Sequence, residues 1–133
     1  MTGSRSRDSR RRAEARGRTA ERLAELRLML TGWRVVDRRA RTGAGEIDLV
    51  AVRGGVLSFI EVKARADVEA ALQAVSFRQR ERLLRAGALW RGRHARFAHL
   101  QPRFDLMVVT PGRWPKRVEN AFQAETRNAQ DLI

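Results

Sequence analysis

The apolar residues of this chain follow two repeats, one typical of helices and one typical of strands. From Thr19 onward they recur at every third or fourth position, which predicts an amphipathic helix, and Gly32 is suited to end it. The apolar positions of this predicted helix are Ala20, Leu23, Ala24, Leu26 and Leu30. Residues 33–38 then predict a short strand, and residues 39–45, which hold two glycines, predict a loop.

Two apolar runs, residues 46–53 and 56–64, stand on either side of Gly54-Gly55. A Gly-Gly pair between two strand-like runs predicts a tight β-hairpin. Both faces of both runs are largely apolar, so we expect the hairpin to lie between two layers. If the turn has two residues, Arg53 faces Val56, and the pairing of all the other residues follows from that.

The second half of the chain predicts two helices and at least one further strand. Residues 68–75 are compatible with a short helix, and Ser76 is suited to cap a longer one that ends near Arg91. The expected core positions of the longer helix are Leu83, Leu84, Ala88 and Trp90. Residues 104–110 form a third strand-like run, and the stretch from Val118 predicts a short strand or turn followed by a helix. We therefore predict an α/β fold: a three-layer α/β/α sandwich whose mixed sheet contains the hairpin at its centre.

Charge separates the first 18 residues from the rest of the chain. They contain seven arginines, two acids and almost no large apolar side chain, which predicts a disordered basic tail (1–18) before a folded domain (19–133). The whole chain of 133 residues has a formal net charge of +13, so phosphate polyanions are the expected partners. The tail could hold a nucleic-acid backbone, or it could only aid solubility.

Other features of the composition exclude whole classes of function. The chain has no cysteine, which excludes disulfides, thiolate metal sites and cysteine nucleophiles. No apolar run approaches the roughly 20 residues that cross a bilayer. The arginine-rich N-terminus is not followed by the apolar stretch of a secretory signal. We therefore expect a soluble, cytoplasmic protein with no membrane partner.

The predicted register gathers charged residues at one end of the hairpin. It pairs Asp48 with Glu61 and Glu46 with Lys63, and the two-residue period of a strand places all four on one face. Directly opposed carboxylates have Cβ atoms roughly 4.5–5.5 Å apart and repel each other. Either a hard divalent cation, Mg²⁺ or Mn²⁺, or a proton on one acid would relieve that repulsion. The structural alternative is a Glu46–Lys63 ion pair, with Asp48 and Glu61 pointing into solvent.

Lys63 stands out because arginine dominates the cations of this chain. Of 28 lysines and arginines, only Lys63 and Lys116 are lysine. An arginine would stay protonated, whereas a lysine beside a metal can orient or deprotonate a water, or stabilise charge on an attacked phosphate. The charge pattern by itself leaves the catalytic and the structural interpretations open.

The sequence resembles the YraN-type family of small bacterial proteins in two segments, residues 45–51 (GEIDLVA) and 59–65 (FIEVKAR). That family is assigned to the restriction-endonuclease-like fold of the PD-(D/E)xK nuclease superfamily. The superfamily pattern is an acid on one strand and acid-x-lysine on the next, and Asp48 and Glu61-Val62-Lys63 match it here. The likeness covers roughly residues 16–122.

The resemblance implies a nuclease that uses Mg²⁺ or Mn²⁺ to cleave DNA or another nucleic acid. It implies that Asp48 and Glu61 hold the metal and that Lys63 positions or activates the attacking water. It also implies that Glu21, on the first helix, reaches the metal, and that Glu46 binds metal or positions Lys63. The alternative is a protein of the same fold that binds nucleic acid without cutting it.

Basic residues outside the motif are candidate nucleic-acid contacts. The longer predicted helix carries several arginines, which could follow a phosphate backbone or form an ordinary solvated face. From this helix and from the flanks of the motif segments, the candidate contacts are Arg41, Arg65, Arg78 and Arg82. We expect nucleic acid, first of all DNA, as the partner. A homodimer is also compatible with this function, since nucleases that cut both strands often work as dimers.

Two further kinds of residue have more than one interpretation. Trp33, Trp90 and Trp114 could stack on bases, but an aromatic content of only 6% favours roles in packing. Asp105 stands at the start of the apolar run 104–110, where it either caps the strand or has a secondary role near the site.

Overall fold

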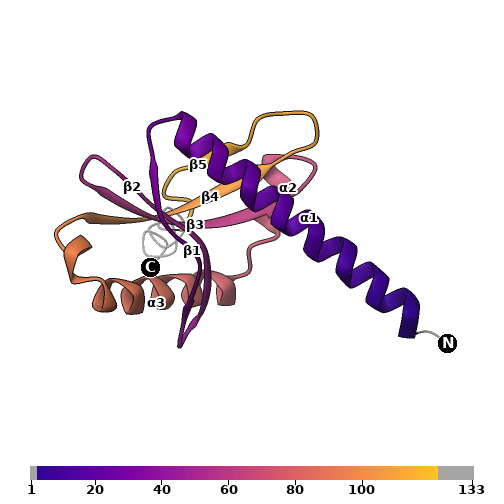
Figure 1. Cartoon of the computed structure of the whole chain (residues 1–133), viewed down its shortest axis with the longest axis horizontal. Helices are drawn as coiled ribbons and strands as arrows, with labels where there is room; N and C mark the ends of the chain where they lie inside the picture. The colour runs from indigo at the N-terminus through magenta and orange to yellow at the C-terminus, as the bar shows by residue number, and fades with distance from the viewer. Residues whose placement is uncertain (1–2, 123–133) are drawn as a thin grey trace, which may run out of the picture.

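The computed structural model describes residues 3–122 and places one five-stranded sheet between two helical layers (Figure 1). The strands are β1 (Arg34–Thr42), β2 (Gly45–Arg53), β3 (Val56–Ala64), β4 (Gln101–Val109) and β5 (Lys116–Val118). The helices are α1 (Gly3–Leu30), α2 (Val68–Gln73) and α3 (Phe77–Arg93), and a short 3₁₀ turn, Ala95–Phe97, follows α3.

The order of the strands in the sheet is also their order along the chain. Neighbouring strands run antiparallel except for β3 and β4, which are parallel and are connected through α2 and α3. The sheet is therefore mixed, and the β2–β3 hairpin supplies its middle strand. The α/β class, the three layers and the central hairpin are confirmed, while the narrower restriction-endonuclease-like assignment stays a prediction.

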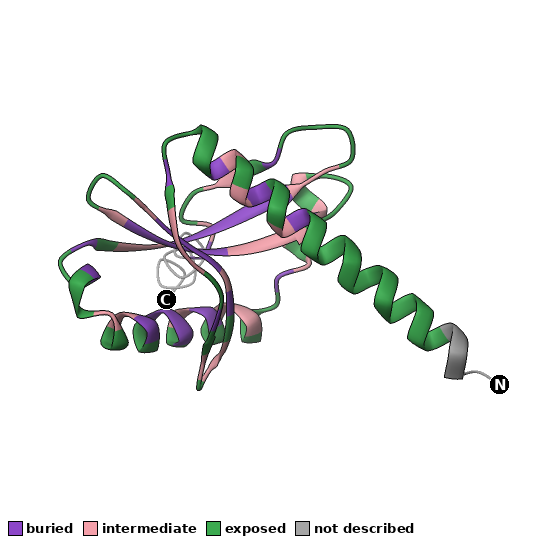
Figure 2. Ribbon diagram, viewed as in Figure 1, coloured by how far each residue is buried: buried purple, intermediate pink, exposed green. Residues whose placement is uncertain are grey.

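Two hydrophobic clusters fill the spaces on either side of the sheet, and Figure 2 shows the buried residues concentrated on its middle strands. On the α3 side, the ring of Phe59 stacks on Phe104 with 5.3 Å between centroids and meets the edge of Trp90 at 5.8 Å. The cluster on the α1 side is smaller and contains Ala24, Leu28, Trp33, Leu49, Ala51, Ile60 and Met107.

Helix α1 begins at Gly3, much earlier than the predicted start at Thr19. Residues 3–18 of the segment predicted as a disordered tail are thus helical here; the segment lacks proline and contains seven arginines, which favour helices. Residues 6–19 are all exposed, and the N-terminal part of α1 extends beyond the sheet (Figure 1). Burial starts only at Ala20, so a domain boundary near residue 18 stays a prediction. None of the described helices is both long and apolar enough to cross a membrane.

Only part of the predicted apolar positions of α1 lie on the face that packs on the sheet. The buried positions are Ala20, Ala24 and Leu28, whereas Leu23, Leu26 and Leu30 are each at least 40% exposed. Both sets have helical spacing, so periodicity alone could not distinguish them. The chosen face carries two alanines, which let the helix lie close to the bulky residues of the sheet.

The end of α1 and the start of the sheet follow from local hydrogen bonds. Gly32 has a φ of +90°, and its N–H bonds the Met29 carbonyl while the Trp33 N–H bonds the Leu28 carbonyl, which closes the helix as predicted. The prediction of a loop over 39–45 was wrong, since β1 pairs with β2 as far as Thr42 and leaves a turn of only two residues.

The remaining elements lie close to the predicted ranges. Ser76 caps α3: its Oγ accepts a hydrogen bond from the Gln79 N–H, and its own N–H donates to the Gln79 side chain. The buried positions of α3 are Leu83, Ala86, Gly87 and Trp90, while Leu84 is half-buried and Ala88 is exposed, contrary to prediction. The strand predicted near Val118 is β5, and the helix predicted after it lies beyond the described residues.

Candidate active site

The β2–β3 hairpin has the predicted register, but only for part of its length. Pairing runs from Arg53 opposite Val56 to Leu49 opposite Ile60, where it ends. Beyond that point β2 remains paired only with β1, and β3 remains paired only with β4. The two strands therefore separate at the end of the hairpin where the charged residues lie.

Asp48 lies at the point of separation. Its Oδ2 accepts a hydrogen bond of 2.8 Å from the Val62 N–H, so a side chain takes the place of a backbone bond between the strands. The predicted pairs Asp48–Glu61 and Glu46–Lys63 are consequently not partners in the β ladder. The prediction was wrong here because, at this end, β2 pairs with β1 and β3 pairs with β4, and the hairpin sequence itself contains no sign of these pairings.

The surroundings of Asp48 disfavour its negative charge. Burial and the nearby Glu61 carboxylate raise the pKa of Asp48 from 3.8 to about 7, and the Glu21 carboxylate adds to the rise. The hydrogen bond from Val62 and the charge of Lys63 act in the opposite direction, but less strongly overall. Two acids and one lysine thus interact with the largely buried carboxyl group of Asp48.

Lys63 pairs with Glu61, and its Nζ lies 3.4 Å from Glu61 Oε1. Both side chains are largely buried, whereas Glu46 is exposed. The structural alternative of a Glu46–Lys63 ion pair, with Asp48 and Glu61 in solvent, is therefore not what the fold forms. Lys63 instead lies within the acid cluster, in agreement with the proximity that the resemblance implied.

Glu21 reaches the same place from α1. Its Oε2 accepts a hydrogen bond of 2.9 Å from the Arg39 Nε, which holds the side chain against β1. One cleft of about 410 Å³ is lined by Glu21 and Asp48, and a second, of about 450 Å³, is lined by Glu21 and Lys63. Glu21 thus stands between two clefts that open onto the cluster.

The other candidate residues surround this centre at different distances. Glu46 lines a small hollow on the α3 side with Glu61 and Arg82. Arg82 is exposed, and its stem lies against Gly45, where a Cβ would come within 2.9 Å of the Arg82 Cδ. The remaining cations are exposed: Arg41 opposite Glu46 in the β1–β2 ladder, Arg65 at the rim of the Lys63 cleft, and Arg78 in the first turn of α3.

The acid cluster suits a hard divalent cation in its chemistry, although it is not assembled as a finished site. Within residues 3–122, no three acidic or histidine side chains already converge at metal-binding distances. Glu61 is engaged by Lys63 and Glu21 by Arg39, so these side chains would have to turn toward a shared ion. Carboxylate oxygens are what Mg²⁺ and Mn²⁺ prefer, and a cation would remove the repulsion on Asp48.

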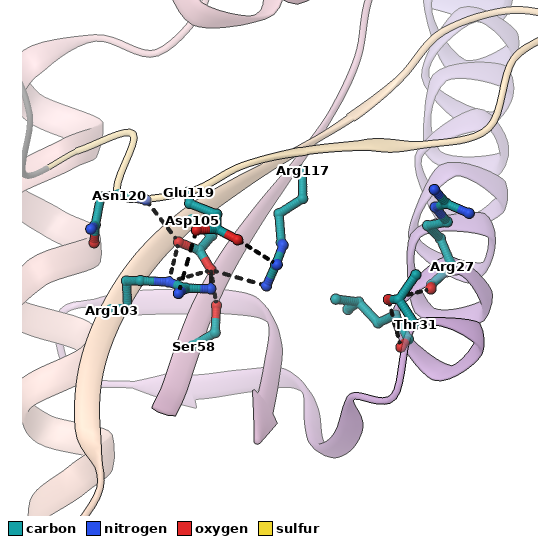
Figure 3. Close-up of polar contacts among 9 residues, drawn as sticks. Arg27, Thr31, Ser58, Arg103, Asp105, Arg117, Glu119 and Asn120 are labelled. Atoms are coloured by element: carbon teal, nitrogen blue, oxygen red, sulfur yellow. Dashed lines mark hydrogen bonds and ion pairs between the residues drawn. The ribbon is translucent and has the colours of Figure 1, made fainter. Parts of the chain in front are cut away.

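A second polar cluster, centred on the fully buried Asp105 of β4, was not predicted (Figure 3). Ser58 Oγ donates to its Oδ2 at 2.5 Å, and the Asn120 N–H donates to its Oδ1 at 2.9 Å. The Arg103 guanidinium bonds both carboxylate oxygens, at 3.0 Å each. Asp105 thus ties β3, β4 and the segment after β5 together rather than capping its strand.

Two arginines extend this second cluster to the end of α1. Arg117 lies 3.9 Å from Asp105, and its guanidinium stands over the Trp33 ring at 4.4 Å. Glu119 pairs with Arg117 at 2.6 Å and with Arg103 at 3.7 Å (Figure 3). The sequence contains one sign of this cluster: Asp105 stands within an apolar strand, two residues after Arg103, so both side chains lie on the same face of the strand.

Comparison with known proteins assigns the chain to a family. The family described as Uncharacterised protein family UPF0102 matches residues 20–109, which include the acid cluster and the strands β1 to β4. The chain belongs to the UPF0102 family. This confirms the YraN-type resemblance that the two motif segments indicated.

Individual UPF0102 proteins match nearly the whole chain. A UPF0102 protein of Maricaulis maris is 51% identical over 125 residues, which are 94% of this chain and 98% of the relative. One of Mesorhizobium japonicum is 46% identical over 114 residues, 86% of this chain and 91% of the relative. One of Brucella canis is 49% identical over 118 residues, which are 89% of this chain and 94% of the relative. These names state the family and no activity.

Proposed function

We propose that this UPF0102 protein is a metal-dependent phosphodiesterase that cleaves nucleic acid, first of all DNA. The observation that supports this most directly is the position of Asp48, held by the Val62 N–H where β2 and β3 separate, beside Glu61 and Lys63. The mixed sheet, with an acid and acid-x-lysine on its central hairpin, also supports the restriction-endonuclease-like assignment, which is part of this proposal.

The acid cluster is difficult to explain by stability alone. An ionised Asp48 is destabilised by burial and by two neighbouring carboxylates, and an asparagine could accept the same hydrogen bond from Val62 without that charge. Groups with strongly perturbed pKa values in a cleft are candidates for catalysis. The unfavourable charge is therefore better explained by a ligand that needs it.

Each residue of the cluster has a distinct role in the proposed reaction. Asp48 and Glu61 would hold Mg²⁺ or Mn²⁺, with Glu21 as a further ligand. When bound, such an ion polarises a phosphoryl oxygen and lowers the pKa of its water. Lys63, no longer paired with Glu61, can bind a non-bridging phosphate oxygen or accept a proton from the attacking water. Glu46 and Arg82 lie on the α3 side, where they can position the Glu61–Lys63 segment.

The charge distribution supports a nucleic-acid substrate. The net charge of +13 favours any polyanion, and Arg65 lies at the rim of the cleft that Lys63 lines. Residues 6–19 of α1 form an exposed helix rich in arginine beside this region. Contacts of this kind bind phosphates without reading bases, so they supply affinity for a strand rather than for a sequence.

The test is a cleavage assay on labelled single-stranded, duplex and flap DNA with Mg²⁺ or Mn²⁺. We expect cleavage by the wild-type chain, and a loss of at least about a hundredfold for Asp48→Asn and for Lys63→Met. Glu69→Gln, which changes an exposed acid of α2, is the matched control and should cleave like wild type. Circular dichroism of each variant checks that the fold is intact.

Two outcomes would reject the proposal. Equal cleavage by wild type, Asp48→Asn and Lys63→Met would show that this cluster performs no chemistry. No cleavage by the wild-type chain, with binding that survives both chelation and Asp48→Asn, would favour the alternative of a non-cleaving nucleic-acid-binding protein. That binding should still weaken steeply with salt.

A further inference from the structure

An open groove of about 920 Å³ lies between α1 and the loop that joins β4 to β5. We call it the α1 groove. Its walls are mostly apolar and are formed by Ala20 and Leu23 of α1 and by Val109, Pro111 and Pro115 around the loop. A mostly apolar lining and a volume of this size are common in sites that bind small organic groups.

Trp114 lines the α1 groove and is 58% exposed. The other two tryptophans are core residues, with Trp33 and Trp90 only 5% and 2% exposed. The guanidinium of Arg27 lies over the Trp114 ring, 5.7 Å from its centroid, and helps to fix the indole in place. A large aromatic ring that is held in position yet open to solvent is a ready surface for stacking.

The charges around the α1 groove are all of one sign. Arg16, Arg65 and Arg113 line it, and no acid is among the lining residues. An apolar peptide would gain nothing from three arginines. A ligand that combines a planar aromatic ring with negative charge satisfies both the apolar walls and the cations, and a nucleotide is such a ligand.

The α1 groove continues into the proposed active site. The residues Arg16, Ala20, Ala64 and Arg65 line both this groove and the cleft that contains Glu21 and Lys63. Ala64 directly follows Lys63 in β3. A strand whose phosphate lies at Lys63 would therefore bring its neighbouring nucleotide to the mouth of the groove.

We propose that the α1 groove binds an unpaired nucleobase next to the scissile phosphate, with the base stacked on Trp114 and its phosphates near Arg16, Arg65 and Arg113. This inference rests on the proposed function and adds the substrate class: nucleic acid that is single-stranded or unpaired beside the cleavage site. A base inside a duplex is stacked and paired, and it would first have to be flipped out at a cost in free energy.

The experiment measures binding of a single-stranded oligothymidylate and of a duplex of equal length, in the presence of EDTA so that cleavage does not occur. Because Trp33 and Trp90 are buried, quenching of tryptophan fluorescence reports mainly on Trp114. We expect the single strand to quench this fluorescence. Labelled oligonucleotides in an anisotropy assay then compare the variants. We expect Trp114→Ala to bind the single strand roughly tenfold to a hundredfold more weakly, and Trp114→Phe to keep most of the affinity.

Two controls accompany these variants. Phe77→Ala removes an even more exposed aromatic ring, on α3 outside the groove, and should bind like wild type. The duplex should bind wild type and Trp114→Ala with nearly equal affinity. Because Trp114 is exposed, its substitution should leave the thermal unfolding temperature close to that of wild type.

Three results would overturn the inference: equal affinity of wild type and Trp114→Ala for the single strand, an equal loss for single strand and duplex, or protection of Trp114 by a concentration-dependent dimer without DNA. The last result would assign the groove to a second copy of the chain. If cleavage depends on Asp48 but the affinity for the single strand does not depend on Trp114, only the assignment of the α1 groove as a base-binding site fails. If binding depends on Trp114 but cleavage is absent, only the proposed function fails.

Discussion

Replacing Asp48 by asparagine should change how the stability of the metal-free protein depends on pH. Asparagine has the shape of a protonated aspartic acid and can still accept the hydrogen bond from Val62 through its carbonyl oxygen. It removes only the charge that burial and Glu61 disfavour. The variant therefore isolates the free energy of ionising one buried carboxyl group.

The sign follows from the raised pKa. The pKa of Asp48 rises from 3.8 to about 7 on folding, so between these values the folded state binds a proton that the unfolded chain does not. The stabilisation from this proton is complete below about pH 4 and is lost as pH rises through about 7. One pKa unit corresponds to about 1.4 kcal/mol, so full ionisation lowers the free energy of unfolding by at most about 4 kcal/mol.

The assay is urea unfolding of wild type and Asp48→Asn in EDTA, at pH 4.0 to 8.5, followed by tryptophan fluorescence. Other titrating groups are common to both proteins and cancel in the difference. We expect the free energy of unfolding of Asp48→Asn to be about 2–4 kcal/mol higher than that of wild type at pH 8. This difference should approach zero near pH 4. A divalent cation at a hundred times its Kd should then stabilise wild type alone, by about 2.7 kcal/mol. A difference that does not vary with pH would refute the reasoning.

Three further predictions concern the fold and the charged surface. Gly87→Ala should lower the free energy of unfolding by about 1–3 kcal/mol in urea, because its Cβ would lie 2.7 Å from the Phe104 ring, whereas Gly92→Ala, with open space, should raise it by up to about 1 kcal/mol. Asp105→Asn should cost about 3–5 kcal/mol in the same assay, since it leaves Arg103 without its buried partner. The double variant Arg7→Gln and Arg11→Gln should bind duplex DNA more weakly, and the slope of log K against log salt concentration should decrease in magnitude by up to about 2. An unchanged slope would show that these arginines of α1 do not contact the phosphates.

The central hairpin could be predicted from sequence as far as local rules apply. Gly54-Gly55 fixes the turn, the turn fixes the register, and the register is correct from Arg53 to Leu49. Beyond Leu49 each strand stays paired with its outer neighbour, and no pattern within the hairpin reports that. The charged residues were thus placed at the correct end of the sheet but in the wrong pairing.

Helix α1 shows a different limit. Its leucines and its alanines both recur with helical periodicity, and the sequence pattern did not show which of them would be buried. Beneath the helix, Trp33, which precedes β1, and Leu49 and Met107 of the sheet fill the space, so that Ala20 and Ala24 fit against them. Which face packs is decided by the volume of the partner surface, and that is a property of the assembled fold.

Asp48 of β2 is a partly buried acid and Asp105 of β4 a fully buried one, and their different surroundings give them different explanations. Asp105 accepts hydrogen bonds from a serine, an arginine and a backbone N–H, so its burial is accounted for by the elements it ties together. Asp48 receives one bond from Val62 and faces two carboxylates. A satisfied buried charge can be retained for the fold alone. An acid whose neighbours oppose its charge is relieved either by a proton or by a cation. In the function proposed above the cation is a metal ion, and the Lys63 ammonium suits a phosphate.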